Sequence, residues 1–305
     1  MNNFHYEEGV CSHTFHELGR CFHLWTSERC EVIFQTVEDF RAGMNIIGIC
    51  AKFYPELRIL GFEIMSNHLH FAIAGDEATI LSFIETLKKF LARYFKKAGR
   101  TIDWSGFCGK TRELTTLEDI RNVIVYINRN GYVVSSEHTP FTYPWGSNRY
   151  YFSPDSVAYA SILSRHMTLR ERQAAVRSRS ADHIKDLEVF DGYALPLSFC
   201  GIASGERLFR NPSHYFHKLG RSIENQKKIA QEISESIFYT DDELFSAISS
   251  LAKDKFGCHS LSHAPAAAKL ELSKVMRYEY NASSKQIQRI LKISSATLMS
   301  LLGGQ

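Results

Sequence analysis

The chain contains 305 residues, of which 44% are hydrophobic and 23% are charged, and this composition predicts folded domains with buried cores and excludes a disordered chain. A chain of this length is expected to form two domains. Its formal net charge of +3 is too small to indicate a nucleic-acid partner, so such a partner has to be inferred from local clusters of charge.

The cysteines and the first residues bear on location. Seven cysteines include no Cys-x-x-Cys pair, so we predict neither a disulfide framework nor a cysteine zinc site and expect a reducing compartment. The start of the chain has no basic segment followed by an apolar one, and no apolar run approaches the roughly 20 residues that span a bilayer. We therefore expect a cytoplasmic protein without a membrane partner.

The first half of the chain alternates strand and helix patterns. Residues 21–26 and 31–34 have the composition of strands, and residues 39–53 carry apolar side chains at helical spacing and stop before Pro55. Two further strands follow, so this half predicts an α+β domain with an antiparallel sheet.

A pair of histidines begins the second of these later strands. Residues 57–65 and 68–74 read as strands separated by S-N, a two-residue connection typical of a hairpin. Successive strand side chains point to opposite faces, so His68 and His70 project from the same face. Such a pair, alone, is more often structural, but its spacing is that of two metal ligands.

A basic helix is predicted next, over residues 79–98, and Gly99 ends it. Its second half contains no acidic residue. The cations that we regard as a candidate track for DNA phosphates are Lys88, Lys89, Arg93, Lys96 and Lys97. Tyr94 and Phe95 lie among them and would stack on bases if exposed. The alternative is a solvated surface.

The following helix is predicted over residues 117–130, with Thr115 and Glu118 spaced as a capping box at its start. Tyr126 and Asn130 lie one turn apart on one flank of this helix. If that flank faces the histidines, Asn130 would add an amide oxygen to a bound cation, which would polarise a phosphodiester for attack by the Tyr126 hydroxyl. The product would be a covalent phosphotyrosine that conserves the energy needed for rejoining.

Three segments within roughly residues 20–152 resemble the single-tyrosine HUH transposases, including the repeat-associated tyrosine transposases. They are H-L-H after M-S-N, then Y-I-N-R-N, then Y-P-W-G-S. The resemblance implies a ferredoxin-like sheet that presents two histidines, a facing helix that supplies a tyrosine, and Mg²⁺ or Mn²⁺ as the cofactor. Members of the family cut and rejoin single-stranded DNA next to hairpins, leaving a 5′-phosphotyrosine and a free 3′-hydroxyl.

Carried over to this chain, the resemblance assigns the nucleophile to Tyr126. It assigns the metal ligands to His68, His70 and Asn130. Two positions depart from the family pattern, because Ser66 and Gly131 stand where the family usually has proline. Both are turn or helix-end positions, so these departures affect local geometry more than chemistry.

The second half of the chain lacks strand alternation. We expect residues 1–152 to form the catalytic domain, residues 153–194 a basic helical linker, and residues 195–305 an all-helical domain. Near its end, residues 266–303 predict a helix-turn-helix, for which a plain helical bundle is the alternative. The residues suspected of contacting duplex DNA are Lys285, Gln286 and Arg289.

These features together predict a transposase, a metal-dependent tyrosine DNA transesterase that acts on single-stranded or hairpin DNA. Duplex DNA is the partner expected for the C-terminal domain, and a homodimer is a further candidate assembly. The main alternative is a catalytically silent domesticated relative that binds structured DNA or RNA as a regulator. A replication-initiating or relaxase-type HUH nickase is a second alternative, against which the Y-P-W-G-S segment argues.

Overall fold

The computed structural model divides the chain into two compact units, Met1–Leu219 and Gly220–Gln305. The residues that the structure describes are 5–27, 32–133, 142–153, 168–177, 185–221, 229, 239, 241–258 and 260–302.

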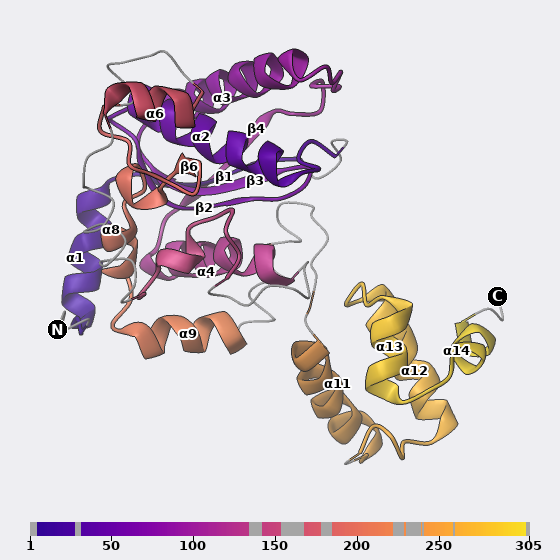
Figure 1. The fold of residues 1–305 in the computed structure, drawn as a ribbon. Helices are drawn as coiled ribbons and strands as arrows, with labels where there is room; N and C mark the ends of the chain where they lie inside the picture. Colours follow the sequence, from indigo (N-terminus) through magenta and orange to yellow (C-terminus); the bar gives the residue numbers. More distant parts are fainter. Residues whose placement is uncertain are drawn as a thin grey trace. The chain divides into compact units, whose positions relative to one another are not determined.

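A four-stranded antiparallel sheet forms the centre of the larger unit (Figure 1). Its strands, in chain order, are β1 (Cys21–Thr26), β2 (Arg58–Ile64), β3 (Leu69–Ala74) and β4 (Gly109–Leu114). They lie side by side in the order β2-β3-β1-β4, and each pair of neighbours is antiparallel. The predicted α+β class is confirmed as this sheet with a mostly helical remainder.

One predicted strand is wrong, and one observed strand was not predicted. Residues 32–34, the described part of the strand expected at 31–34, are irregular, and the N–H groups of Ile33 and Phe34 both donate to the Ser66 carbonyl at 2.8 Å. The predicted elements did not include β4, whose sequence G-K-T-R-E-L is polar. Among the described strands, β4 pairs with β1 alone and lies at one edge of the sheet. An edge strand buries few side chains, so it lacks the apolar pattern of a central strand.

Two helices, α2 (Val37–Phe53) and α3 (Glu77–Lys97), cover one face of the sheet (Figure 1). A reciprocal capping box between Thr36 and Asp39 starts α2, and the Asp76 carboxylate accepts the Thr79 N–H at 3.1 Å to start α3. The strand side chains that face these helices are apolar, and Phe71 meets Phe83 of α3 edge to face at 5.5 Å between ring centroids. The main core therefore lies between the sheet and this helix pair.

A single helix, α4 (Leu117–Val133), covers the other face of the sheet (Figure 1). It begins one residue away from the predicted capping box of Thr115 and Glu118, because the reciprocal hydrogen bonds join Thr116 and Asp119. It also continues to Val133 instead of ending at Asn130. Glycine weakens a helix by only about 1 kcal/mol, so the glycine after Asn130 does not stop it.

The free edge of β2 is covered by other segments of the same unit. Ser147 N–H donates to the Phe62 carbonyl at 2.9 Å, and the Ile64 N–H donates to Trp145 at 2.9 Å. This stretch leads into the short 3-10 helix η1 (Asn148–Tyr150). Further along the same edge, Gly201 N–H donates to the Ile59 carbonyl at 2.7 Å.

The boundary predicted at residue 195 is wrong, because residues 195–219 belong to the unit that contains the sheet. They form the 3-10 helix η2 (Pro196–Ser198), α8 (Ile202–Glu206) and most of α9 (Pro212–Arg221). The helix α8 packs on β2. The buried Arg121 of α4 ties these segments to the N-terminal helix α1 (Glu8–Leu18), since it donates to the Leu208 carbonyl at 2.6 Å and to the Glu8 carboxylate at 2.6 Å.

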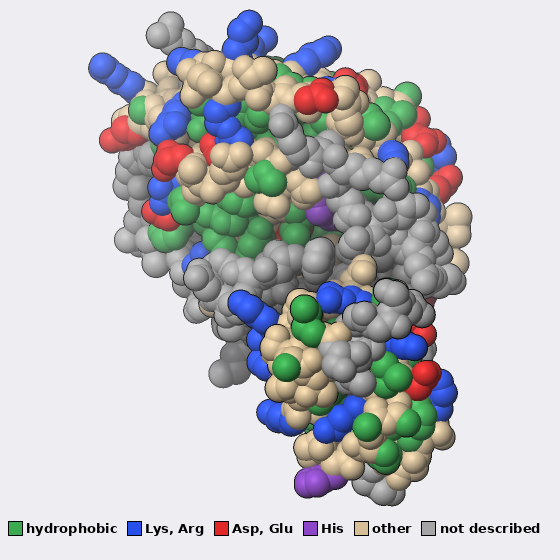
Figure 2. Space-filling view, turned by 90° about the vertical axis from the view of Figure 1, so that its right-hand side faces the viewer, with side chains coloured by type: hydrophobic (Ala, Val, Ile, Leu, Met, Phe, Trp, Pro, Cys, Tyr) green, Lys and Arg blue, Asp and Glu red, His purple; other side chains and the backbone are tan. Residues whose placement is uncertain are grey.

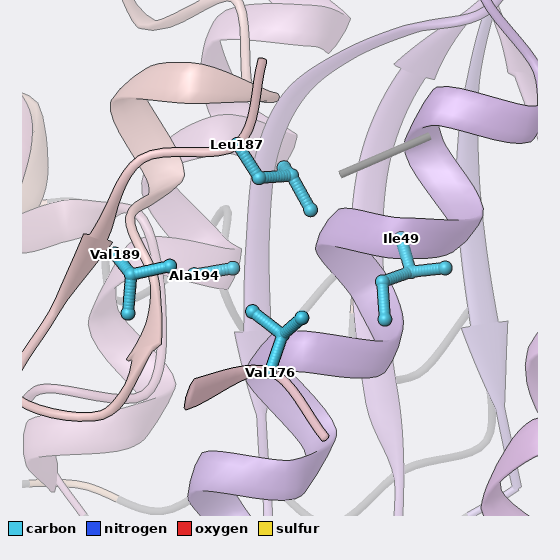
Figure 3. Close-up of a cluster of buried hydrophobic side chains, with 5 residues drawn as sticks. All are labelled: Ile49, Val176, Leu187, Val189 and Ala194. Carbon is cyan, nitrogen blue, oxygen red and sulfur yellow. The ribbon is translucent and has the colours of Figure 1, made fainter. Parts of the chain in front are cut away.

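The described part of the expected linker, residues 153–194, also packs on the sheet-containing unit. It contains α6 (Leu169–Ala175) and a two-stranded hairpin, β5 (Val189–Phe190) with β6 (Tyr193–Ala194). A small apolar cluster joins this segment to Ile49 of α2 (Figure 3). The members that it contributes to this cluster are Val176, Leu187, Val189 and Ala194.

The regular elements in the described residues of the smaller unit are all helices. Its helices are α11 (Asp241–Phe256), α12 (Ala266–Tyr278), α13 (Ser284–Leu291) and α14 (Ser295–Leu302). They bury Ile248, Leu272, Met276 and Ile287 among themselves. Across both units, no helix in the described residues is long and apolar enough to cross a membrane.

Candidate active site

The two predicted histidines lie together at the start of β3. The Met65 N–H donates to the His68 carbonyl at 2.9 Å, which closes the predicted two-residue hairpin connection. The rings of His68 and His70 are nearly perpendicular, with their centroids 4.9 Å apart. His70 is fully buried and His68 is 8% exposed. The prediction that both imidazoles share one face is confirmed.

Tyr126 of α4 packs against the same group of rings. Its ring centroid is 5.6 Å from that of His70, at an interplanar angle of 90°, and 6.0 Å from that of His23. The tyrosine is only 1% exposed. Asn130 lies one turn further along α4 and is half-buried. The structure thus brings Tyr126 and the histidine pair together across two layers of the fold.

A third histidine, His23 of β1, belongs to the group and was not predicted. Its Nε2 is 3.2 Å from the Nδ1 of His70, and the two rings are stacked with centroids 5.4 Å apart. His23 is fully buried and lies opposite Ala72, on the same face of the sheet as His70. His23 lies beside His70 because β1 pairs with β3. The pairing of two distant strands cannot be recognised from a single sequence.

Hydrogen bonds at Nδ1 orient both rings of the pair. The Nδ1–H of His68 donates to the Asn67 side-chain oxygen at 2.7 Å, and Nδ1 of His70 is bonded to His23. If Nδ1 of His70 donates the proton of the second hydrogen bond, the Nε2 atom of each ring carries the lone pair that could bind a metal ion. In protein metal sites, a bond at the other ring nitrogen commonly fixes the tautomer and the ring orientation in this way.

The donor set fits a divalent cation only in part. Two imidazoles and the Asn130 amide oxygen would supply three ligands and leave positions for water or phosphate oxygens. Within the described part of the chain, no three His, Cys, Asp or Glu side chains form a ready-made metal site. Any cation held here would therefore depend on Asn130 and on oxygen atoms from outside the protein.

Glu63 adds a buried carboxylate beside the histidines. It lies directly opposite His70 on the neighbouring strand β2 and is 1% exposed. Gly146 of the Y-P-W-G-S segment packs onto it, and a Cβ atom at Gly146 would lie 2.8 Å from the Glu63 Cδ and 2.9 Å from the Phe62 carbonyl oxygen. Burial, and to a lesser extent the Glu63 charge, raises the pKa of the Tyr143 hydroxyl well above its usual range.

A hydrogen-bonded chain links the Y-I-N-R-N and Y-P-W-G-S segments. The Ser147 hydroxyl donates to the Asn128 side-chain oxygen at 2.6 Å, and the Asn128 amide donates to the Tyr215 hydroxyl at 2.9 Å. That hydroxyl in turn donates to Asn148 at 2.7 Å. The two segments are therefore parts of one buried network that fixes the α4 register against β2.

The predicted basic track lies on the opposite side of the sheet from Tyr126, because α3 carries it. Lys89, Arg93, Lys96 and Lys97 are exposed, and Lys88 is half-buried. Lys and Arg side chains (blue in Figure 2) stand out along the upper edge of the sheet-containing unit, where α3 lies in Figure 1. Of the aromatic residues expected to stack on bases, Phe95 is fully buried and Tyr94 is half-buried, so that expectation is wrong for Phe95.

Two of the three residues suspected of reading duplex DNA make contacts within the smaller unit. Arg289 forms two hydrogen bonds with the Asp241 carboxylate, at 2.7 and 3.0 Å, and lowers the pKa of that group. Gln286 completes a capping box with Ser283 and donates to the Tyr239 carbonyl at 2.8 Å. Lys285 is exposed.

Comparison of the chain with family models, curated proteins and solved structures gives no significant match. The functional assignment therefore rests on the arrangement of His23, His68, His70 and Tyr126.

Proposed function

We propose that the protein is a metal-dependent tyrosine transesterase of single-stranded or hairpin DNA, that is, a transposase. The observation that carries the proposal is the packing of the Tyr126 ring against His70, at 5.6 Å between centroids. The two residues come from different layers and distant parts of the chain, and the resemblance to the single-tyrosine HUH transposases implies that they meet. A tyrosine nucleophile, with two imidazoles and an amide that could hold a divalent cation, suits phosphodiester chemistry.

The topology supports the same proposal. The chain order β1-α2-β2-β3-α3-β4 and the spatial order β2-β3-β1-β4 match those of a ferredoxin-like split β-α-β unit, the fold expected for the catalytic domain. In this arrangement β1 and β3 are central, so that their side chains are presented to α4.

In the proposed reaction the Tyr126 oxygen bonds to phosphorus, and the bond from phosphorus to the 3′ oxygen of the preceding nucleotide breaks. The tyrosine releases its proton, and the departing oxygen takes one up to become a 3′-hydroxyl. Mg²⁺ or Mn²⁺ held by His68, His70 and Asn130 would stabilise the negative charge that develops on the phosphate oxygens. The phosphotyrosine bond conserves energy, so a second 3′-hydroxyl can reverse the step and join two strands.

Access to the nucleophile sets a condition on this mechanism. Tyr126 is 1% exposed, so a phosphodiester can reach its hydroxyl only after neighbouring groups move. An opening step of this kind commonly limits turnover in enzymes with closed sites. The same burial favours a second candidate, a catalytically silent protein that binds structured DNA or RNA through its basic surface.

The smaller unit fits a duplex-binding role under this proposal. Three residues separate α13 from α14, the first of them, Lys292, has a positive φ of 50°, and the Ser294 hydroxyl caps α14 at 3.0 Å from the Thr297 N–H. Two short helices joined by such a turn are typical of a helix-turn-helix. The second helix of that motif enters the major groove, so α14 would read bases and Lys285 would lie nearer the phosphates.

The test is incubation with labelled single-stranded hairpin DNAs and Mn²⁺ or Mg²⁺, followed by denaturing electrophoresis. We expect a covalent protein–DNA band that requires the metal and is lost in Tyr126→Phe. Tyr278→Phe is the matched control, because Tyr278 is 71% exposed and should leave the band unchanged. A band that persists in Tyr126→Phe excludes this nucleophile, and binding without a band for all hairpins and both metals supports the silent regulator.

A further inference from the structure

A cavity of about 910 Å³ opens between α2, α3 and α6, away from the histidine group. The helices α2 and α3 cover the apolar face of the sheet, whereas α4 and Tyr126 lie on the other face. The volume is within the range of about 300–1,000 Å³ that is common for small-molecule sites. The cavity is therefore separate from the proposed reaction.

Its walls combine an apolar floor with a basic rim. The floor is formed by Ala42, Ile46 and Ile49 of α2 together with Val176 after α6. Of the charged side chains that line the cavity, one is acidic and four are basic. They are Glu38, Arg41, Arg93, Lys97 and Arg177. A site of this composition favours a ligand with one flat apolar part and one anionic part.

The basic side chains differ in how far their charge is already neutralised. Glu38 accepts hydrogen bonds from Arg41 and Arg177, both at 2.8 Å, and these two contacts help to lower its pKa. Arg93 and Lys97 form no ion pair with any residue that the structure describes, and they lie one turn apart on α3. The Arg93 guanidinium lies 5.5 Å from the Phe90 ring centroid, which holds it at the rim. Arg93 and Lys97 are thus the cations available to a bound anion.

We propose that this cavity binds a nucleotide, with the base against the apolar floor and the phosphate at Arg93 and Lys97. Charge-assisted hydrogen bonds from a guanidinium and an ammonium group suit a phosphate, and the floor offers the apolar contact that a base requires. The nucleotide is either free in solution or part of a nucleic-acid strand. Both sources share this chemistry, and they differ in whether the nucleotide is joined to others in a strand.

The experiment uses the full-length chain and two fluorescent probes. One probe is 2-aminopurine ribonucleoside monophosphate, and the other is a single-stranded hexanucleotide that contains 2-aminopurine. The test variant is Arg93→Ala with Lys97→Ala. The matched control is Lys110→Ala with Arg207→Ala, which removes the same charge from exposed positions of the same unit that lie outside the cavity and outside the basic track. A third variant, Ala174→Trp, fills the cavity from its exposed α6 side without changing any charge.

We expect the Arg93/Lys97 variant and Ala174→Trp to weaken probe binding at least tenfold, and the Lys110/Arg207 variant to weaken it less than threefold at 0.15 M salt. Tight binding of the monophosphate identifies a free nucleotide, whereas cavity-dependent binding of the hexanucleotide alone identifies a strand. Equal losses in the two double variants, or no binding of either probe, would overturn the proposal. Tyr126→Phe should retain binding, so loss of the covalent band and loss of this site are separate results.

Discussion

The two faces of the sheet differ in what they bury. The face under α2 and α3 presents aromatic and aliphatic side chains, of which Phe71 and its contact with Phe83 are representative. The face under α4 buries His23 of β1, Glu63 of β2 and His70 of β3. Because adjacent residues of β3 point to opposite faces, one strand serves both an apolar core and a polar site.

This difference shows how stability and chemistry are divided. Burying apolar area stabilises the fold without specific partners, whereas each buried polar group requires a partner and costs free energy without one. The apolar face should therefore set the stability of the unit, and the polar face should set its activity. Substitutions on neighbouring residues of one strand can separate the two.

The largest expected effect is on the apolar face. Phe71→Ala should lower the free energy of unfolding by roughly 3–5 kcal/mol, since it removes a fully buried ring and leaves a cavity. Denaturant unfolding measures this loss, and the yield of covalent adduct per folded molecule should stay unchanged. A large fall in that yield at full folding would show that the two faces are coupled.

A pH effect comes next, from a buried carboxylate at the end of α8. Burial raises the pKa of Glu206 to about 7, although the Phe152 N–H that it accepts at 2.6 Å opposes the shift. The folded protein binds the extra proton, so stability should be full below the ordinary pKa of about 4.5 and should fall by about 3 kcal/mol as pH rises to about 7.

Denaturant unfolding at pH 4.5 and pH 8 tests this sign. In Glu206→Gln the fall in stability that Glu206 causes between these pH values should disappear. Other titrating groups contribute equally to both proteins, so their effect cancels when the two free energies of unfolding are subtracted. Identical pH profiles for the variant and the parent protein would show that Glu206 titrates normally.

The partner of a proposed metal ligand gives the next effect, because changing such a partner commonly lowers metal affinity or activity about 10–100-fold. His23→Phe should raise the Mn²⁺ concentration needed for covalent adduct formation by such a factor, because His70 loses its hydrogen bond at Nδ1. His23→Gln, which can still bond to that nitrogen, should restore most of the metal response. If both variants respond alike, His23 acts by packing alone.

The smallest effects should come from a pair of helix caps. Thr36→Ala at the start of α2 and Thr116→Ala at the start of α4 each remove one cap and should cost about 1 kcal/mol of stability. Only the α4 variant is expected to lower adduct formation, by a few-fold, because α4 carries Tyr126. Equal activities would indicate that the first turn of α4 does not affect the position of the tyrosine.

The sequence predicts the parts of this site that depend on local spacing. The alternation in the β3 segment places His68 and His70 on one face, and the helical period places Tyr126 one turn before Asn130. His23 and Glu63 depend on strand pairing between distant segments, which no local pattern contains. The predicted cap of α4 is one residue away from the observed one, because T-T-L-E-D contains two overlapping capping boxes. Packing of the whole helix determines which of the two forms.

The covered edge of β2 also affects how the protein can associate. The carbonyls of Ile59 and Phe62 are taken by the N–H groups of Gly201 and Ser147, so this edge offers few main-chain acceptors to another strand. At the opposite edge, β4 carries charged side chains that disfavour strand addition. Exposed sheet edges are common starting points for aggregation, and here each edge has its own protection. Both edges of the sheet therefore disfavour a dimer in which two sheets join into one.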